Sequence, residues 1–417
     1  MKTFVINAQE NTRVPFLRGI LTRALLDAGL TFDDAFALAT SVRNDLADMG
    51  EVSNDELRRR VLEKLRELGD DSVVKLYRSP SAGPARILVR GQSGNVSAFS
   101  RGRHERFLQA SGIRDARAER ITAMIYDQLL AHGVQSIDTD ELGLLTWLCL
   151  AQEVGKKAAR RYLVWSDFQR EESPLLVLIG GAVGSGKSSI ATEIAHRLEI
   201  VRTQSTDILR EVMRMMVPER LLPVLHQSSF EAWRKLPARG GQAQNSDQLV
   251  AEGFRSQAEL LSVPCEAVLQ RAVRESVAII LEGVHVLPGL IRRLPADSNA
   301  VAVHVTLAVL RPDELKSRLR GRSRREPRRH VKRYLDNFNS IWQLQSYLLS
   351  EADREDAAII TNDERETTVY RVIAAINEEL ARRFDSDPAE VFEGAIRRLG
   401  KKALERHWQE LVPRLTR

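Results

Sequence analysis

A glycine-rich turn that ends in a lysine is the clearest chemical signal in the sequence. Residues 180–189 read Gly-Gly-Ala-Val-Gly-Ser-Gly-Lys-Ser-Ser, which matches the phosphate-binding pattern G-x-x-x-x-G-K-[ST]. Glycines let successive backbone N–H groups curve around phosphate oxygens, and a lysine adds a positive charge. The sequence therefore predicts a site for a nucleoside triphosphate and Mg²⁺. Its predicted residues are Gly181, Gly184, Ser185, Gly186, Lys187, Ser188 and Ser189, with Lys187 also catalytic and Ser188 a metal ligand.

Two carboxylates follow predicted strands and are candidates for the chemistry. Glu282 ends the apolar run 277–281, as the acidic residue of a Walker B element does, and we expect it to bind Mg²⁺ and act in catalysis. Asp207 follows the run 201–205 and is placed to accept or orient the proton of an acceptor hydroxyl. The alternatives are a surface glutamate at a strand end and a helix N-cap at residues 205–207.

Further polar residues are candidates for binding the acceptor and the nucleotide. Arg210, one helical turn after Asp207, is predicted to hold an anionic acceptor. His226 and Ser228 lie in an unusually polar segment between apolar flanks, where a histidine is often only structural. Asn362 follows the last apolar run and is predicted to contact adenine, although an asparagine there is as readily a turn residue.

The basic charge of the chain is local. The formal net charge is +6, and residues 311–333 hold eleven basic and three acidic side chains, a balance of +8, so the remainder carries −2. Such a cluster suits the phosphate groups of a small substrate better than nucleic acid, and it also occurs on a solvated helix face. We predict an arginine-rich lid in which Arg318 and Arg325 bind substrate and Arg322 acts in catalysis.

The elements that would position these residues follow an α/β pattern. Short apolar runs separated by helical stretches predict a doubly wound parallel sheet of the P-loop NTPase type. An amphipathic helical tail is expected at 386–417. The predicted strands are 175–179, 201–205, 277–281, 301–307 and 357–360.

An internal repeat occupies the first 168 residues. The pattern Phe-x-Arg-Gly-x-x-x-Arg-x-Leu-x-x-x-Gly begins at Phe16 and again at Phe99, an offset of 83. Each copy predicts a short β start followed by helices. We therefore expect two small domains at 1–79 and 84–168, a catalytic domain at 174–385 and the tail at 386–417.

Composition narrows the class of protein. The chain has two cysteines, Cys149 and Cys265, which argues against a disulfide framework and favours a reducing, cytoplasmic setting. No apolar run is long enough for a membrane span, so no membrane partner is expected.

Each repeat resembles the ATP-cone domain, a small helical module with a few strands. Arg18-Gly19 and Arg101-Gly102 lie where that family places the basic residue that starts a helix. The resemblance implies nucleotide-sensing modules, and a homo-oligomer formed through the repeats is a further expectation. The alternative is a pair of packing modules that bind no ligand.

Longer segments resemble the 2-phosphoglycerate kinase family. Besides 180–189, they are Ser-Thr-Asp-Ile-Leu-Arg-Glu-Val-Met-Arg at 205–214, Leu-His-Gln-Ser-Ser-Phe-Glu-Ala-Trp at 225–233, Glu-Gly-Val-His-Val-Leu-Pro-Gly at 282–289 and Tyr-Leu-x-Asn-Phe at 334–338. The resemblance implies transfer of the γ-phosphoryl group of ATP, with Mg²⁺, to the 3-hydroxyl of 2-phosphoglycerate, a small phosphorylated acid. Two alternatives stay open: a P-loop kinase for another acceptor, such as a nucleotide sugar, and a protein that senses ATP without catalysis.

Overall fold

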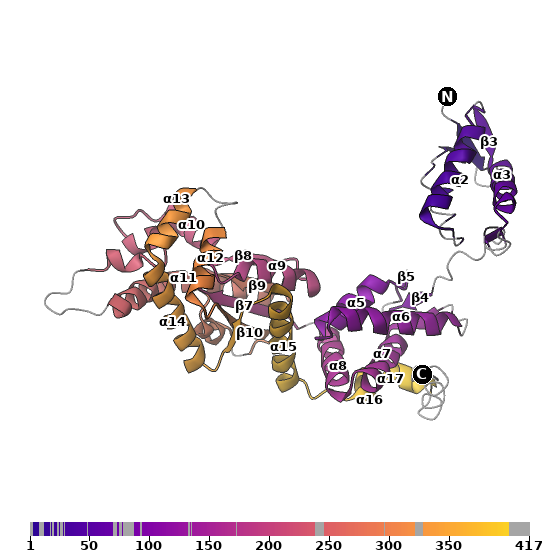
Figure 1. The fold of residues 1–417 in the computed structure, drawn as a ribbon. Helices are drawn as coiled ribbons and strands as arrows, with labels where there is room; N and C mark the ends of the chain where they lie inside the picture. The colour runs from indigo at the N-terminus through magenta and orange to yellow at the C-terminus, as the bar shows by residue number, and fades with distance from the viewer. Residues whose placement is uncertain are drawn as a thin grey trace. The chain divides into compact units, whose positions relative to one another are not determined.

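The predicted strands of the second half form one parallel sheet in the computed structural model (Figure 1). The strand order is β11-β10-β7-β9-β8, and every adjacent pair is parallel. The sheet confirms the predicted P-loop type of architecture, although two strands begin two residues later than predicted. The strands are β7 (Leu175–Gly181), β8 (Thr203–Ser205), β9 (Ile279–Glu282), β10 (Val301–Ala308) and β11 (Ala358–Thr361).

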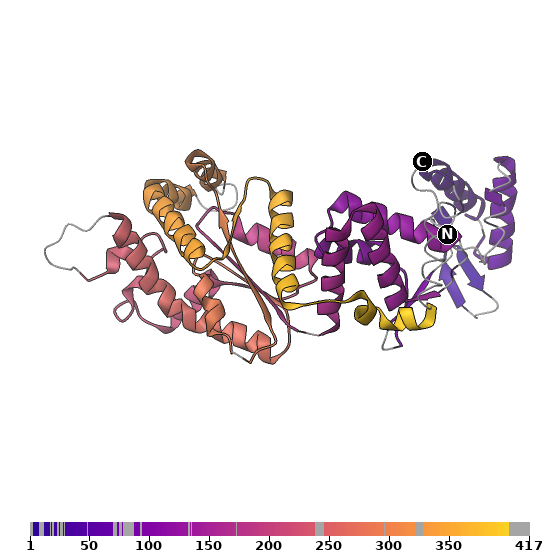
Figure 2. The same cartoon turned by 90° about the horizontal axis from the view of Figure 1, so that it is seen from below.

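Helices cover both faces of this sheet, because the central strand is apolar on both sides. Leu175, Val177 and Ile179 of β7 pack with α9 (Lys187–Arg197) and α15 (Arg365–Arg383). The alternate residues Leu176 and Leu178 pack with α11 (Ser246–Arg274). Figure 2 shows the same two layers of helices from below. The arrangement is that of a doubly wound sheet.

The remaining elements of this half lie around the carboxyl ends of the strands and over the α11 face. They are α10 (Thr206–Met216), α12 (Pro312–Gly321), α13 (Arg328–Asp336), α14 (Phe338–Arg354) and the 3₁₀ helices η1 (Pro223–His226), η2 (Ala232–Lys235) and η3 (Pro288–Arg293).

A helical segment before the sheet shares its core. Val164, Trp165 and Phe168 belong to the same apolar cluster as β7, α9 and α15. Arg197 at the end of α9 bonds to Asp115 through both carboxylate oxygens, at 2.8 and 3.1 Å. The helices of this segment are α5 (Arg101–Ala110), α6 (Asp115–Ala131), α7 (Thr139–Glu153) and α8 (Lys156–Arg170), joined at the C-terminal end by α16 (Pro388–Val391) and α17 (Glu393–Leu399).

By its internal contacts the chain divides into two compact units. One contains residues 1–90, 94–99 and 130–137, and the other contains the rest, so that α5 to α8 belong with the five-stranded sheet. The first unit has its own core, to which Leu25, Val42 and Val61 contribute.

The two copies of the internal repeat each contain a small sheet with the same strand arrangement. Two three-stranded sheets have the orders β2-β1-β3 and β5-β4-β6, and in each the first two strands are antiparallel. A third strand between the helices was not part of the prediction. The first copy has β1 (Phe4–Asn7), β2 (Thr12–Pro15), α2 (Phe32–Asp45), β3 (Glu51–Ser53) and α3 (Asn54–Glu67). The second has β4 (Leu88–Arg90), β5 (Val96–Ala98), α5, α6, β6 (Ser136–Asp138) and α7.

The structure describes most of the chain. Within those residues, no helix combines the length and the apolar character needed to cross a bilayer. The described residues are 3–7, 12–16, 18, 21–22, 25, 28, 30–47, 49–69, 73–74, 77, 87–91, 94–131, 134, 136–171, 173–237, 246–295, 297–321 and 328–399.

Candidate active site

Strand register brings the motif segments together at one edge of the sheet. Glu282, the last residue of β9, lies opposite Ile179 of β7 on one side and Ser205 of β8 on the other. The glycine-rich loop follows β7 directly, and Asp207 comes two residues after Ser205. Because carboxyl ends of parallel strands form the usual ligand crevice of such sheets, this edge is the candidate active site.

The loop has the backbone needed to surround phosphate. Gly186 has φ of 89° and caps α9, whose first helical residue is Lys187. A Cβ atom on Gly186 would lie 2.3 Å from Asn362 Nδ2, so only glycine fits there. The helix N-terminus supplies free N–H groups and a partial positive charge, as phosphate requires.

Lys187 and Ser188 connect the loop to its surroundings. Lys187 Nζ donates to the carbonyl oxygen of Ala182 at 2.9 Å, and the Ser188 hydroxyl donates to Glu282 Oε1 at 3.0 Å. Glu282 itself is buried. A serine hydroxyl beside a carboxylate fits Mg²⁺, which takes few protein ligands and completes its shell with phosphate oxygens and water. Among the described residues, no group of three or more His, Cys, Asp or Glu side chains could hold a metal alone.

Ser185 provides an independent test of whether a phosphate fits the loop. The residue is completely buried, and its hydroxyl oxygen has no hydrogen-bond partner. A buried polar atom without a partner costs about 1–3 kcal/mol, and the loop tolerates that cost where a ligand supplies the missing bond. The residues present therefore fit a triphosphate.

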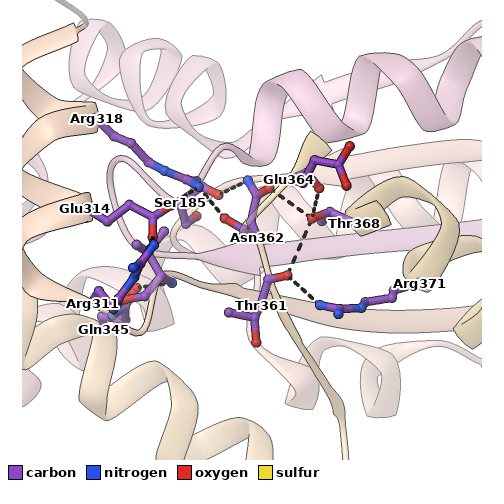
Figure 3. A network of polar contacts seen from close by, with 11 residues as sticks. Ser185, Arg311, Glu314, Arg318, Gln345, Thr361, Asn362, Glu364, Thr368 and Arg371 are labelled. Atoms are coloured by element: carbon purple, nitrogen blue, oxygen red, sulfur yellow. Dashed lines mark hydrogen bonds and ion pairs between the residues drawn. The ribbon is translucent and has the colours of Figure 1, made fainter. Parts of the chain in front are cut away.

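Asn362 supports the loop through hydrogen bonds (Figure 3). Its Nδ2 donates to the carbonyl oxygen of Ser185 at 2.7 Å, and its Oδ1 accepts from the Thr368 hydroxyl at 3.0 Å. Arg318 donates to the carbonyl oxygen of Asn362 and pairs with Glu314 at 2.5 Å. The predicted Asn362 and Arg318 thus lie at the loop, while their contacts with adenine and substrate stay predictions.

Asp207 and Arg210 are brought together on α10. Ser205 caps this helix by accepting from the Asp207 N–H at 3.2 Å, which leaves the Asp207 side chain 66% exposed. Arg210 is mostly buried, its Nη2 lies 4.0 Å from Asp207 Oδ1, and its Nη1 donates to the carbonyl oxygen of Gln227 at 3.0 Å. Arg210 Nε is buried without a partner. The N-cap and the proposed catalytic role are therefore compatible.

The polar segment 225–233 uses some of its groups for structure. His226 Nε2 donates to the carbonyl oxygen of Val217 at 2.9 Å, beyond the end of α10. The carbonyl oxygen of Ser228 accepts from the Glu231 N–H at 2.8 Å. Substrate binding by His226 and Ser228 stays a prediction.

Only part of the predicted arginine lid belongs to the described chain. Arg322 and Arg325 lie outside the described residues. The helix that follows them is held through Arg333, whose Nε donates to Glu231 Oε2 at 2.7 Å. Glu231 is buried and also pairs with Arg234 at 3.1 Å.

Sequence reasoning missed a buried histidine beside these residues. His285 is 2% exposed, and burial lowers the pKa of its imidazole to about 3, with a further lowering by Arg210 and Lys187 that Asp207 opposes. It bonds to Thr206 at 3.3 Å and to Gln257 at 2.8 Å. The available signal was a polar residue between two buried valines, Val284 and Val286.

Sequence comparison assigns this site to a family. No family model matches the chain. A 2-phosphoglycerate kinase from Methanopyrus kandleri is 35% identical over 283 residues, which cover 68% of this chain and 84% of the relative. The enzyme of the same name from Thermococcus kodakarensis is 36% identical over 282 residues, 68% of this chain and 93% of the relative. The chain belongs to the 2-phosphoglycerate kinase family. Its resemblance to that family, predicted from the motifs, is confirmed.

Solved structures resemble the chain more distantly. A gluconokinase from Sinorhizobium meliloti is 12% identical, with a TM-score of 0.29, over 51% of this chain and 93% of its own. A shikimate kinase from Bacteroides thetaiotaomicron is 18% identical, with a TM-score of 0.26, over 50% of this chain and 98% of its own. The fold assignment rests on the strand order and the loop described above.

Proposed function

We propose that the chain transfers the γ-phosphoryl group of ATP to the free hydroxyl of 2-phosphoglycerate, giving 2,3-diphosphoglycerate and ADP. The observation that carries the proposal is the 3.0 Å bond between the Ser188 hydroxyl and Glu282. It joins the phosphate loop to the acidic strand end, and membership of the 2-phosphoglycerate kinase family supplies the acceptor.

Different residues at the loop would bind the triphosphate and the magnesium ion. The backbone of 181–189 and Lys187 would hold the triphosphate, and Ser188 and Glu282 would hold Mg²⁺. Magnesium, when bound, neutralises negative charge on the phosphates. Lys187 would exchange its present bond to Ala182 for phosphate oxygens. Positioning and charge supply most of the catalysis in phosphoryl transfer.

Asp207 and Arg210 serve the acceptor. The exposed carboxylate of Asp207 would take the proton of the acceptor hydroxyl. The acceptor oxygen would then bond to the γ-phosphorus as the bond between that phosphorus and the β–γ bridging oxygen breaks, which releases ADP. Arg210, held by Gln227, would bind the phosphate or carboxylate of the acceptor. An acceptor with two anionic groups accounts for the arginines on this side of the site, and Arg318, Arg322 and Arg325 belong to the same proposal.

Product analysis tests the function. The protein is incubated with ATP, Mg²⁺ and 2-phosphoglycerate, in parallel with 3-phosphoglycerate, glycerate and a nucleotide sugar, and products are identified by mass spectrometry. We expect 2,3-diphosphoglycerate from wild type, little from Asp207→Asn, and normal amounts from Asp353→Asn, which changes an exposed carboxylate on α14. Preference for glycerate or the nucleotide sugar over 2-phosphoglycerate would refute the acceptor assignment. ATP binding without any product would indicate a sensor.

The N-terminal organisation forms a separate part of the proposal. We keep two ATP-cone-like domains at 1–79 and 84–168, before a kinase domain at 174–385 and a tail at 386–417. The shared strand order of the two small sheets supports the division into repeats. Nucleotide binding and self-association by the repeats are tested by calorimetry with dATP and by sedimentation. Cys149 and Cys265 are buried free thiols, which agrees with a reducing cytoplasm.

A further inference from the structure

A chain of buried hydrogen bonds runs from the start of α10 to the turn that receives Arg210. The Thr206 hydroxyl bonds to His285 Nδ1 at 3.3 Å, and His285 Nε2 bonds to Gln257 Oε1 at 2.8 Å. Gln257 Nε2 then bonds to the carbonyl oxygens of Val224 and Gln227 at 2.5 and 3.0 Å. Thr206 and Gln257 have no exposed surface, and Phe254 stacks on the His285 ring at 5.6 Å.

The partners fix the direction of every bond. Two carbonyl oxygens can be served only by the amide nitrogen of Gln257, so its oxygen faces His285. His285 Nε2 must therefore carry the proton and donate, and Nδ1 accepts from the Thr206 hydroxyl. The imidazole is neutral, in agreement with its burial. Each polar atom of the three side chains is used, so the loss of one donor leaves a buried acceptor unpaired.

The hydrogen-bond network of Thr206, His285 and Gln257 is linked to Arg210 through one shared carbonyl oxygen. The carbonyl oxygen of Gln227 accepts from Gln257 and also from Arg210 Nη1, at 3.0 Å in each case. The other end of the network is Thr206, which directly precedes Asp207. The two residues proposed to serve the acceptor are thus tied to the same buried frame. The bonds described for Lys187 and Ser188 on the nucleotide side run to Ala182 and Glu282 instead.

We propose that Gln257 and His285 are positioning residues for the acceptor: through the carbonyl oxygen of Gln227 they hold the Arg210 guanidinium, and through Thr206 they hold the start of the helix that carries Asp207. The inference rests on the proposed phosphoryl transfer to 2-phosphoglycerate. It predicts a change in the affinity for the acceptor that is separate from the affinity for ATP.

Steady-state kinetics of three variants, with a fourth as control, test the assignment. Gln257→Leu removes both donors to the turn, and we expect KM for 2-phosphoglycerate to rise about tenfold while KM for ATP changes less than about twofold. The two replacements of His285 separate the halves of the network. In His285→Gln, the amide nitrogen takes the place of Nε2 and can still donate to Gln257. In His285→Asn, the shorter amide takes the place of Nδ1, so that it can accept from Thr206 but does not reach Gln257. We therefore expect a larger rise in the acceptor KM for His285→Asn than for His285→Gln.

A matched control comes from another buried histidine. His104 on α5 is bonded to two threonines, Thr122 at 2.8 Å and Thr146 at 3.0 Å, in the helical segment before the sheet. His104→Gln should leave both KM values unchanged even if it lowers the melting temperature. The positioning role would be overturned if Gln257→Leu and both His285 variants raised the KM for ATP as much as the KM for the acceptor. It would also be overturned if none of these variants changed either KM. Failure of wild type to phosphorylate 2-phosphoglycerate would instead refute the proposed function.

Discussion

Asn362 Nδ2 donates to the carbonyl oxygen of Ser185 at 2.7 Å, across 177 residues of sequence. The bond joins the end of the edge strand β11 to the phosphate loop after the central strand β7, and Thr368 fixes the orientation of the amide. A side chain that is distant in the sequence therefore holds the loop in shape before any nucleotide binds. Less conformational entropy is then lost when the nucleotide binds.

Removing this support should weaken nucleotide binding. Asn362→Ala leaves the carbonyl of Ser185 without its side-chain donor, and we expect the Kd for ATP to rise about tenfold in calorimetry. Asn377→Ala is the control, because Asn377 is also buried and also donates to backbone oxygens, at Ala110 and Ile373. An equal loss of ATP affinity in both variants would show that the effect is general destabilisation.

Lys187→Ala should nearly abolish turnover. The lysine is proposed to carry the positive charge at the β- and γ-phosphates, so we expect kcat to fall at least about a hundredfold with the fold intact by circular dichroism. Lys157→Ala, which removes an exposed lysine of α8, is expected to keep wild-type kcat. A Lys187→Ala protein with normal turnover would remove the loop from the mechanism.

Gly283→Ala should be strongly destabilising. Gly283 has φ of 153°, and a Cβ atom there would meet the Thr206 hydroxyl at 1.8 Å. Since Thr206 is buried, the start of α10 would have to move, and we expect the free energy of unfolding in urea to fall by about 2–3 kcal/mol. Gly50→Ala, where nothing lies within 4 Å, should change it by less than about 1 kcal/mol. Similar values for both variants would contradict this reading.

Mild acid should destabilise the unit that contains the sheet. Burial lowers the pKa of His104 and of His304 to about 4, and that of His285 to about 3. An unfolded histidine has a pKa near 6.5, so below that pH the unfolded chain binds protons that the folded chain excludes. The stabilisation is fully present above pH 6.5 and is lost as the pH falls toward 4, by about 1.4 kcal/mol per pH unit for each histidine.

Urea unfolding at a series of pH values between 7.5 and 5 measures this slope. His104→Gln should reduce the slope of the unfolding free energy against pH by the contribution of one histidine, about 1.4 kcal/mol per pH unit. An identical slope in wild type and His104→Gln would argue that the imidazole of His104 does not resist protonation in the folded chain.

Local sequence patterns were sufficient for the sheet and for the phosphate loop. Continuous apolar runs identified β7, β9 and β10, because strands buried on both faces have no polar alternation to obscure them. The edge strands β8 and β11 are less buried, and they were predicted where they occur to within two residues. The glycine pattern likewise identified a loop whose conformation depends on few residues. Parallel pairing then placed Ser188 beside Glu282, as the assignment of a second acidic element had required.

Local sequence patterns could not predict contacts between segments that are far apart in the sequence. Gln257 lies in the middle of the 29-residue helix α11, where nothing in its neighbours marks it, and it meets His285 only through the packing of that helix on the sheet. Asn362 was predicted to face adenine because of its place after a strand, but its bond to Ser185 depends on strand order. Trp165 and Phe168 were assigned by the repeat to a separate domain, yet they complete the core beside β7.

The core that α8 shares with the sheet limits how the chain can be shortened in evolution or in the laboratory. Removing residues before 172 would take Val164, Trp165 and Phe168 out of the apolar cluster that also holds side chains of β7, α9 and α15. It would also strip Arg197 of its bidentate carboxylate. A chain that begins at residue 172 is therefore expected to be less stable than one that keeps α5 to α8, and a relative without this segment would need another apolar surface in its place.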